Sequence, residues 1–483
     1  MERSLRAIAA KGVRWTTLSA LAAIGAQLLQ LYIATQIVSP EELGLFAIVL
    51  LVLGLLRVFA DGGFDFGILH RQQMSPEELA SVYWISVAVG TGLYGAAALV
   101  GAPLVAWAYG EPRLHTLVSL GALSYMMVPF GLMYGTLLRK HLRFQAVATI
   151  EICAAVAGPL GTLAAAWAGY KVAALIFGLA AANVVRSGLL ILIGGRSWRP
   201  SLYLSFQAAK YFVGFGLYQV GNRFISFLSS RADQILISAF LGPEILGYYA
   251  LAWNAVVQPV YLINPIMTRV FAPILATVQD ELARLRRGFL SLIGLTSMIN
   301  IPLIAGFAAI APIFVPLIFG AQWAPAIPIM QLLAVVGVVR AIGNPTGALI
   351  IARGRPDLGF YWSVISTAVQ LPVLYLAVQS GSIIAMTVAL AGLQVLTLAG
   401  IYWFLHRPLL GPCLRDWLGQ VGPPLVFAST MAAAVHLALR LLDLQGLFDM
   451  VGLVVLGAIL YGGLYGVLRR QAIVDLARTA LAR

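Results

Sequence analysis

The sequence predicts an all-α, polytopic membrane protein with about fourteen transmembrane helices, and three observations support this fold class. Hydrophobic residues make up 61% of the 483 residues. Charged residues make up only 10%, whereas soluble domains have about 25%. Apolar runs of about 20 residues, the length that crosses a hydrocarbon core of about 30 Å, recur along the whole chain.

Charge clusters and Pro/Gly turns divide the chain into candidate membrane helices. The first run is too long for the hydrophobic region of a signal peptide, and another run follows it at once, so we expect it to be retained. The second helix is extended to about residue 70, because the helix at the matching position of a sequence repeat, described below, is equally long. The approximate ranges are 13–37, 43–70, 79–108, 114–138, 145–168, 172–194, 211–240, 246–276, 288–316, 326–351, 359–379, 382–405, 420–441 and 446–468.

The distribution of basic residues predicts the orientation of these helices. With the N-terminus in the cytoplasm, 22 of the 31 lysines and arginines fall on cytoplasmic ends or loops. Three fall outside, and six lie within the predicted spans. Because short cytoplasmic loops are enriched in Lys and Arg, we predict that both termini are cytoplasmic.

A sequence duplication groups the predicted helices into two halves. Residues 241–250, LGPEILGYYA, repeat residues 38–47, VSPEELGLFA, at an offset of 203 with five of ten positions identical. Each copy holds six spans, an even number, so both keep the same orientation and should be related by a two-fold axis along the membrane normal. We predict an N-terminal lobe over 1–200, a C-terminal lobe over 201–410, a central cavity between them, and two extra helices with an amphipathic tail over 411–483.

The predicted spans contain more arginine than carboxylate, although each buried charge costs about 2.5 to 3.5 kcal/mol. The in-span arginines are Arg57, Arg186, Arg223, Arg231, Arg269 and Arg340. The in-span acids are Asp61, Asp65, Glu151 and Asp233. Complete pairing leaves six minus four, or two, positive charges. Because guanidinium binds phosphate and carboxylate through paired donors, we predict that the six arginines line a cationic cavity for an anionic substrate.

Several of these charges have a second interpretation. Arg57, Asp61 and Asp65 are spaced by four, so their helical stripe either lines the cavity or holds an interfacial arginine beside local carboxylates. Glu151 and Arg186 lie at similar depth, which favours a buried ion pair; alternatively, Glu151 binds a proton or a cation. The candidates for ion coupling or charge pairing are Asp61, Glu151 and Asp233.

Helical spacing and the repeat give two further predictions. Arg231 and Asp233 are two residues apart, so they do not face each other on a helix and need other partners. The offset of 203 places Asn264 opposite Asp61, so polar character recurs on the matching helix.

The sequence also argues against several classes of protein. No loop is long enough for an aqueous domain, the chain has no G-x-x-x-x-G-K-[ST] motif, and its apolar spans have no H-E-x-x-H motif. We therefore expect no cofactor, no metal site and no catalytic residues. The net charge of +13 lies mostly in short loops, so no nucleic-acid partner is expected. Cys153 and Cys413 are not expected to form a disulfide.

Three strings carry a family resemblance: residues 44–72, GLFAIVLLVLGLLRVFADGGFDFGILHRQ; residues 82–90, VYWISVAVG; and residues 248–290, YYALAWNAVVQPVYLINPIMTRVFAPILATVQDELARLRRGFL. They resemble bacterial polysaccharide-transport flippases of the multidrug/oligosaccharidyl-lipid/polysaccharide superfamily. The closest likeness is to the Wzx-type subgroup that exports colanic acid, teichuronic acid and other exopolysaccharide repeat units. The resemblance is strongest over roughly residues 1–300.

The resemblance implies a function for the predicted cavity. It implies alternating access that moves an undecaprenyl-diphosphate-linked oligosaccharide from the cytoplasmic to the outer leaflet of the bacterial inner membrane. It places the chain in exopolysaccharide or lipopolysaccharide biosynthesis, beside the polymerase and glycosyltransferases of the same pathway. The implied protein is a transporter and not an enzyme.

Three alternatives remain at this point. A multidrug exporter of the same superfamily would favour carboxylates for cationic drugs, so the arginine surplus argues against it. A lipid II flippase carries a similar anionic head and is harder to separate. A polyprenyl-dependent membrane enzyme, such as a polysaccharide polymerase, would need sizeable outer loops, whereas the predicted outer loops are short turns.

Overall fold

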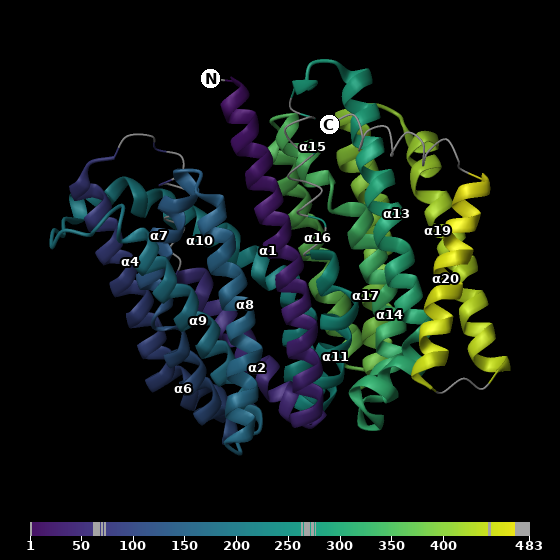
Figure 1. The fold of residues 1–483 in the computed structure, drawn as a ribbon, viewed down its shortest axis with the longest axis horizontal. Coiled ribbons are helices and arrows are strands. Elements are labelled where there is room, and N and C mark those ends of the chain that lie inside the picture. The colour runs from purple at the N-terminus through teal and green to yellow at the C-terminus, as the bar shows by residue number, and fades with distance from the viewer. Residues whose placement is uncertain are drawn as a thin grey trace. The chain divides into compact units, whose positions relative to one another are not determined.

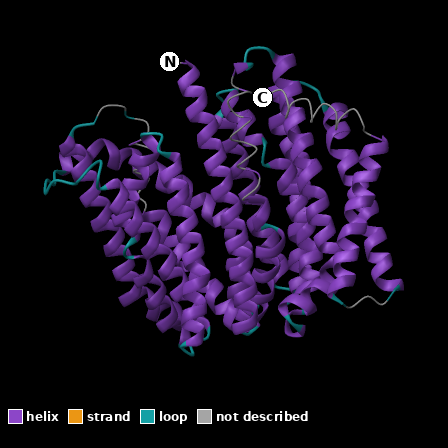
Figure 2. Cartoon of the chain, in the orientation of Figure 1, coloured by secondary structure: helices purple, strands orange, loops and turns teal. Residues whose placement is uncertain are grey.

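A computed structural model describes residues 2–60, 74–261, 277–442 and 446–468, together with Ile68, Arg71, Asn264, Phe271 and Leu275. Within these ranges, side chains are described from residue 12 onward, apart from residues 13, 208, 211, 213–215, 217, 218 and 222. The chain forms two compact units, Met1–Ala250 and Leu251–Arg483. Regular structure in the described ranges is entirely helical (Figure 1, Figure 2).

In the first unit, the sequence S-P-E-E sets where helices begin. Ser39 N donates to Glu42 Oε2 over 2.9 Å, and Glu42 N donates to Ser39 Oγ over 3.2 Å. Ser75 and Glu78 form the same reciprocal cap before α4. The helices are α1 (Glu2–Ile37), α2 (Pro40–Ala60), α4 (Pro76–Ala96), η1 (Ala97–Gly101), α5 (Ala102–Tyr109), α6 (Arg113–Tyr125), α7 (Val128–Lys140), α8 (Phe144–Trp167), α9 (Val172–Gly194), α10 (Phe206–Phe240) and the start of α11 (Gly242–Val256).

The second unit is also a helical bundle, in which α19 packs along α13 and α20 packs along α19 (Figure 1). Its remaining helices are α13 (Leu282–Phe314), η2 (Val315–Phe319), η3 (Ala321–Trp323), α14 (Ala326–Gly343), α15 (Thr346–Ala352), α16 (Pro356–Val378), α17 (Ile383–Ile401), η4 (Tyr402–His406), α18 (Arg407–Leu410), α19 (Leu414–Leu441) and α20 (Leu447–Leu468).

The described helices occupy the predicted spans. Twelve of them are long and apolar enough to cross a membrane, and they coincide with predicted spans one to six and nine to fourteen. The seventh span coincides with α10 and the eighth begins in α11. The predicted end of the second span, near residue 70, lies outside the continuously described residues. The chain is therefore a multi-pass membrane protein; the lobe limits 1–200, 201–410 and 411–483 stay predictions.

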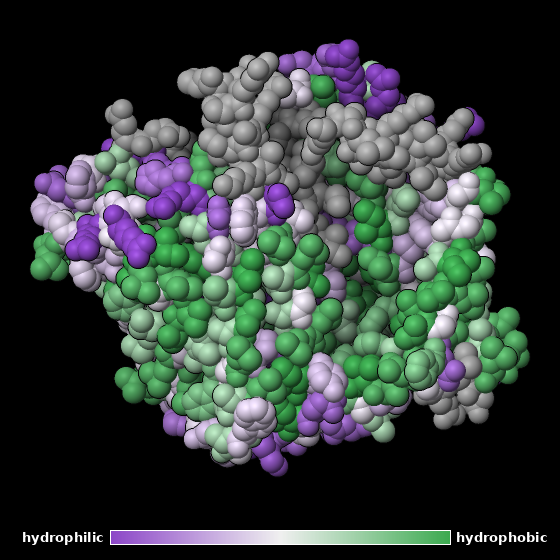
Figure 3. Space-filling view, viewed as in Figure 1, coloured by the Kyte–Doolittle hydropathy of each residue, from purple (hydrophilic) through white to green (hydrophobic). Residues whose placement is uncertain are grey.

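The surface has the distribution of hydropathy that a bilayer requires. On the face in view, hydrophobic residues cover the middle of the helices and hydrophilic residues gather near their ends (Figure 3). Large apolar side chains such as Trp107 and Trp167 are 83% and 89% exposed. Exposure of this kind is favourable where lipid rather than water surrounds the protein.

Small residues bring α8 and α9 into close contact in the first unit. A methyl group on Gly178 would overlap the Thr162 hydroxyl, and one on Gly161 would lie 2.6 Å from the Ala181 Cβ. Close backbone approach through small residues is how membrane helices pack tightly, since lipid supplies no hydrophobic driving force between them.

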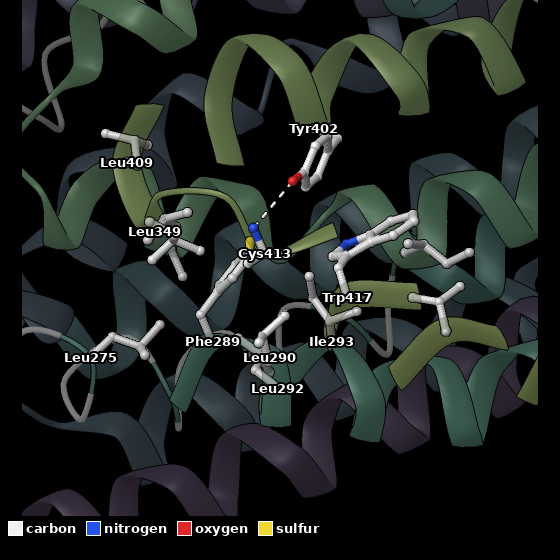
Figure 4. Close-up of a cluster of buried hydrophobic side chains, with 14 of the residues drawn as sticks. Leu275, Phe289, Leu290, Leu292, Ile293, Leu349, Tyr402, Leu409, Cys413 and Trp417 are labelled. Atoms are coloured by element: carbon white, nitrogen blue, oxygen red, sulfur yellow. Dashed lines mark hydrogen bonds between the residues drawn. The ribbon is translucent and has the colours of Figure 1, made fainter. Parts of the chain in front are cut away.

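A cluster of buried hydrophobic side chains, three of them aromatic among those labelled, includes Cys413 just before α19 in the second unit (Figure 4). Tyr402 Oη accepts a hydrogen bond of 3.2 Å from the Cys413 backbone N–H, and Phe289 and Trp417 belong to the same buried cluster. Burial raises the pKa of the Cys413 thiol, because the thiolate would lose its hydration. Cys153 and Cys413 are both free, as predicted.

The two copies of the duplicated motif contact each other reciprocally. A methyl group on Gly44 would overlap the carbonyl oxygen of Pro243, and one on Gly247 would overlap the carbonyl oxygen of Pro40. Pro40 and Gly44 in the first copy correspond to Pro243 and Gly247 in the second, at the offset of 203. Each copy therefore presents its glycine to the proline carbonyl of the other, as a local two-fold relation between the copies requires.

Candidate functional site

Arg340, in α14, is held by aromatic rings. Its Cζ lies 4.9 Å from the centre of the Trp253 ring and 5.6 Å from that of Tyr261. Its Nη1 donates a hydrogen bond to Tyr261 Oη. Among the described residues, no carboxylate forms an ion pair with Arg340. A guanidinium over an aromatic face is stabilised by the ring quadrupole, yet it keeps its full positive charge.

Sequence reasoning missed the aromatic partners of Arg340. Trp253 lies in α11, and Tyr261 lies five residues beyond the end of that helix. Trp253 is only 3% exposed. The available signal was the cluster of aromatic residues in the string YYALAWNAVVQPVY, together with the surplus of in-span arginine, because aromatic faces stabilise guanidinium groups.

A buried polar cluster contacts the backbone of α14 at Ala341, the residue after Arg340. Asn264 Nδ2 donates to the Ala341 carbonyl oxygen over 3.5 Å, and Asn300 Nδ2 donates to Asn264 Oδ1 over 3.0 Å. Asn264 and Asn300 are 1% and 2% exposed. Asn264 is the residue that the repeat aligns with Asp61, which lies outside the described residues. The cluster joins Asn264 to the backbone of α14, one residue from Arg340.

Arg186 and Glu151 form an ion pair between α9 and α8. Arg186 Nη2 lies 2.9 Å from Glu151 Oε2, and Arg186 Nε donates to the same oxygen over 3.1 Å. The pair is not buried as the sequence favoured: the two side chains are 35% and 39% exposed. Glu151 therefore neutralises Arg186 on a partly accessible helix surface.

Arg231 and Asp233 bind other partners, as their spacing predicted. Arg231 Nη1 donates to Gln234 Oε1 over 3.1 Å. Asp233 is 1% exposed and accepts a hydrogen bond from Tyr249 Oη. One turn further along α10, Ser238 Oγ shares a hydrogen bond of 2.9 Å with Tyr109 Oη. The C-terminal end of α10 therefore carries a row of hydrogen-bonded polar side chains that includes the Asp233 carboxylate.

Arg57 and Arg223 lie on two helices that pack against each other. Phe59 of α2 contacts Phe224 of α10 with ring centres 5.8 Å apart, and a methyl group on Gly54 would lie 2.9 Å from the Phe227 ring. These pairs show that α2 and α10 run antiparallel, so Arg57 and Arg223 lie at a similar level along the helix pair. Asp61 and Arg269 lie outside the described residues.

The described residues contain no cluster of three or more His, Cys, Asp or Glu side chains that could hold a metal ion. The polar groups of the membrane helices are instead guanidinium, aromatic hydroxyl and amide, with few acids. This chemistry suits an anionic or hydroxyl-rich ligand, because these groups donate hydrogen bonds and carry net positive charge.

Comparison with known proteins shows two relatives of the chain in curated polysaccharide pathways. The chain is 30% identical to "Lipopolysaccharide biosynthesis protein WzxC" of Escherichia coli (strain K12), over 86% of this chain and 84% of that protein. It is also 30% identical to "Teichuronic acid biosynthesis protein TuaB" of Bacillus subtilis (strain 168), over 82% of this chain and 81% of that protein.

The fold has solved counterparts as well. The structure titled "Lipid II flippase MurJ, inward closed conformation" matches with a TM-score of 0.76 at 14% identity, over 96% of this chain and 99% of that one. The family model described as "Polysaccharide biosynthesis protein" matches residues 33–328, more than half of the chain. These matches confirm the resemblance predicted from the sequence, and the chain belongs to the family of polysaccharide biosynthesis proteins.

Proposed function

We propose that the protein is a flippase that moves an undecaprenyl-diphosphate-linked oligosaccharide from the cytoplasmic to the outer leaflet of the bacterial inner membrane, with both termini in the cytoplasm. The observation that carries the proposal is Arg340, a membrane-embedded arginine held by Trp253 and Tyr261 and paired with no described carboxylate. The names of the relatives, which concern lipopolysaccharide and teichuronic acid biosynthesis, support the same substrate class.

In this proposal, Arg340 binds the diphosphate of the substrate. The Trp253 ring stabilises the guanidinium through its face, and Tyr261 accepts one N–H. A guanidinium has five N–H donors in one plane, so donors remain for a bidentate contact with phosphate. Arg57, Arg223, Arg231 and Arg269 would add positive charge along the path, while the prenyl chain stays in lipid. No step of this transport requires catalytic chemistry.

The reciprocal contact between the repeated motifs provides a pivot for alternating access. Gly44 and Gly247 receive the proline carbonyl of the opposite copy, so backbone meets backbone near the starts of α2 and α11. We infer that this close backbone contact, which small residues allow, serves as the pivot. We expect Gly44→Ala and Gly247→Ala to abolish transport, and Gly25→Ala, where an added methyl group meets no atom within 4 Å, to leave it intact.

Two carboxylates are candidates for coupling to an ion gradient. Asp233 is buried and accepts a hydrogen bond from Tyr249, so protonation would change a contact inside α10 and α11. Glu151 is already paired with Arg186, which makes it the weaker candidate. Transport into vesicles with and without a proton or sodium gradient, in Asp233→Asn and in the wild type, tests this coupling.

The proposal is tested by the lipid-linked intermediates of a deletion strain. We expect an undecaprenyl-diphosphate-linked repeat unit to accumulate on the cytoplasmic side when the chain is deleted, and export to return with the wild type but not with Arg340→Ala. Accumulation of lipid II would instead identify a lipid II flippase. Normal polymer export together with lost drug resistance would identify a multidrug exporter, and an unpolymerised repeat unit on the outer side would identify a polymerase.

A further inference from the structure

A cavity of about 480 Å³ lies in the first unit, and none of the in-span arginines lines it. Its walls are α1 with Gly12 and Trp15, the turn between α7 and α8 with Leu142 and Arg143, and the start of α8 with Thr149. A methyl group on Gly12 would lie 2.8 Å from the Phe144 ring, so glycine allows α1 to close one side of the cavity.

The position of the cavity along the helices is that of a bilayer interface. The candidate span of α7 ends at Lys140, and that of α8 begins at Phe144, so the connecting turn lies where the chain leaves the membrane. This turn, RKHLR over residues 139–143, is basic, and the distribution of Lys and Arg predicts that it is cytoplasmic. Trp15 supplies the aromatic ring that is typical of the interface.

At Leu142, the backbone of the turn has a conformation that is energetically unfavourable for leucine. Leu142 has φ 57° and is the only non-glycine with positive φ among the described residues. It ends α7 with a bond from Arg143 N to the Leu138 carbonyl over 2.9 Å. Equivalent helix ends use glycine at this position: Gly110, Gly169 and Gly354, with φ of 63°, 91° and 61°.

Leucine is disfavoured in this conformation, because its Cβ crowds the following carbonyl oxygen. The side chain is 47% exposed and lines the cavity, so burial in the protein core does not account for it. A bound molecule with an apolar part in contact with Leu142 would account for it.

The polar groups of the cavity suit an anion. Arg143 Nη1 donates to Ser197 Oγ over 3.1 Å, and no carboxylate among the described residues pairs with Arg143. The Gln145 side-chain amide makes no hydrogen bond to any described residue, so its N–H groups are available. Thr149 Oγ1 donates to the Gln145 carbonyl over 3.0 Å. One guanidinium and one amide thus provide donors for a phosphate at the rim of an apolar cavity.

We propose that this cavity binds the phosphodiester headgroup of an anionic glycerophospholipid from the cytoplasmic leaflet. Arg143 and Gln145 bind the phosphate, Trp15 lies beside the glycerol, and Leu142 contacts the start of an acyl chain. Basic cavities between membrane helices on the cytoplasmic side are suited to anionic headgroups. None of the arginines of the proposed transport path lines the cavity, so we assign it to a structural lipid and not to the transported substrate.

Lipid binding to the purified full chain tests the proposal. The chain is delipidated in detergent, phosphatidylglycerol is titrated, and bound lipid is counted by native mass spectrometry. The variants are Arg143→Gln, which removes the charge, and Leu142→Gly, which removes the apolar wall while relieving the backbone. The control is Arg287→Gln, since Arg287 is an exposed arginine near the start of α13 whose Nε binds only the Ala283 carbonyl. Phosphatidylcholine and inorganic phosphate serve as the other ligands.

We expect one tightly bound phosphatidylglycerol, weakened about tenfold by Arg143→Gln and unchanged by Arg287→Gln, as loss of one charged hydrogen bond predicts. Leu142→Gly should weaken binding while the Tm of the lipid-free protein stays the same or rises, which a purely structural role for Leu142 would not produce. Equal binding of phosphatidylcholine, or unchanged phosphatidylglycerol binding by Arg143→Gln, would overturn the proposal. If inorganic phosphate binds as tightly as phosphatidylglycerol, and the same variants weaken its binding, the lipid assignment is overturned.

Discussion

Arg186 and Arg340 both lie within membrane-spanning helices, yet the protein compensates their charges in opposite ways. Arg186 is paired with Glu151 through two N–H groups, so the pair is electrically neutral. Arg340 is held by Trp253 and Tyr261, which stabilise the cation and leave its charge uncompensated. The difference shows that an in-span arginine can be stabilised without being neutralised. Only the second arrangement leaves charge for an anionic substrate.

Among changes at the two arginines and their partners, the largest expected effect comes from removing the uncompensated charge. Arg340→Ala should reduce export of the oligosaccharide by roughly tenfold to a hundredfold, because a charge-assisted hydrogen bond is worth about 1.5–3 kcal/mol. Arg340→Lys should restore part of the activity, since an ammonium keeps the charge but not the paired donors. Polymer export in cells measures both. Full export by Arg340→Ala would show that the aromatic-held arginine carries no function.

A smaller loss is expected from the ring under Arg340. Trp253→Leu removes a cation–π contact worth about 0.5–2 kcal/mol, so export should fall roughly threefold to thirtyfold. Trp253→Phe should retain most of the activity, because a phenyl ring keeps a negative face. Trp167→Leu is the matched control, since Trp167 is 89% exposed at the end of α8. Equal losses for Trp253→Leu and Trp167→Leu would argue against a specific contact.

The hydroxyl of Tyr261 should matter less than the Trp253 ring. Tyr261→Phe removes the acceptor of Arg340 Nη1 but keeps the ring. Since one hydrogen bond contributes about 1 kcal/mol net, we expect transport to fall about fivefold. Initial rates of transfer in vesicles loaded with the lipid-linked oligosaccharide measure this. A loss as large as that of Arg340→Ala would mean that Tyr261 itself binds the substrate.

The smallest functional effect is expected from the neutral pair. Glu151→Gln and Arg186→Gln should each lower stability, and the double variant should recover part of the loss, with a coupling free energy of about 1 kcal/mol or less, since both side chains are over one third exposed. Thermal unfolding in detergent measures the coupling. Export by the double variant should stay near the wild-type level; a loss as large as that of Arg340→Ala would end the distinction between the two arginines.

Hydrophobic run lengths were sufficient to place twelve of the fourteen predicted spans, because a span must satisfy its backbone internally over a fixed thickness. The spacing of Arg231 and Asp233 predicted that they would find separate partners, and Gln234 and Tyr249 are those partners. The depth of Glu151 and Arg186 predicted their pairing, but not that the pair would be partly exposed. That exposure depends on which helix faces meet, and similar depth in two spans does not specify a helix face.

The sequence by itself determined the membrane class, the helix positions, the duplication and the excess of arginine, because each depends on local composition or on direct comparison of two segments. Tertiary structure decided which arginine keeps its charge. Helix packing brings Trp253 and Tyr261 over Arg340, about 80 residues away in the chain, and brings Glu151 to Arg186. Side-chain partners across helices depend on rotation and crossing of the helices, which are set by packing of the whole bundle rather than by any one span.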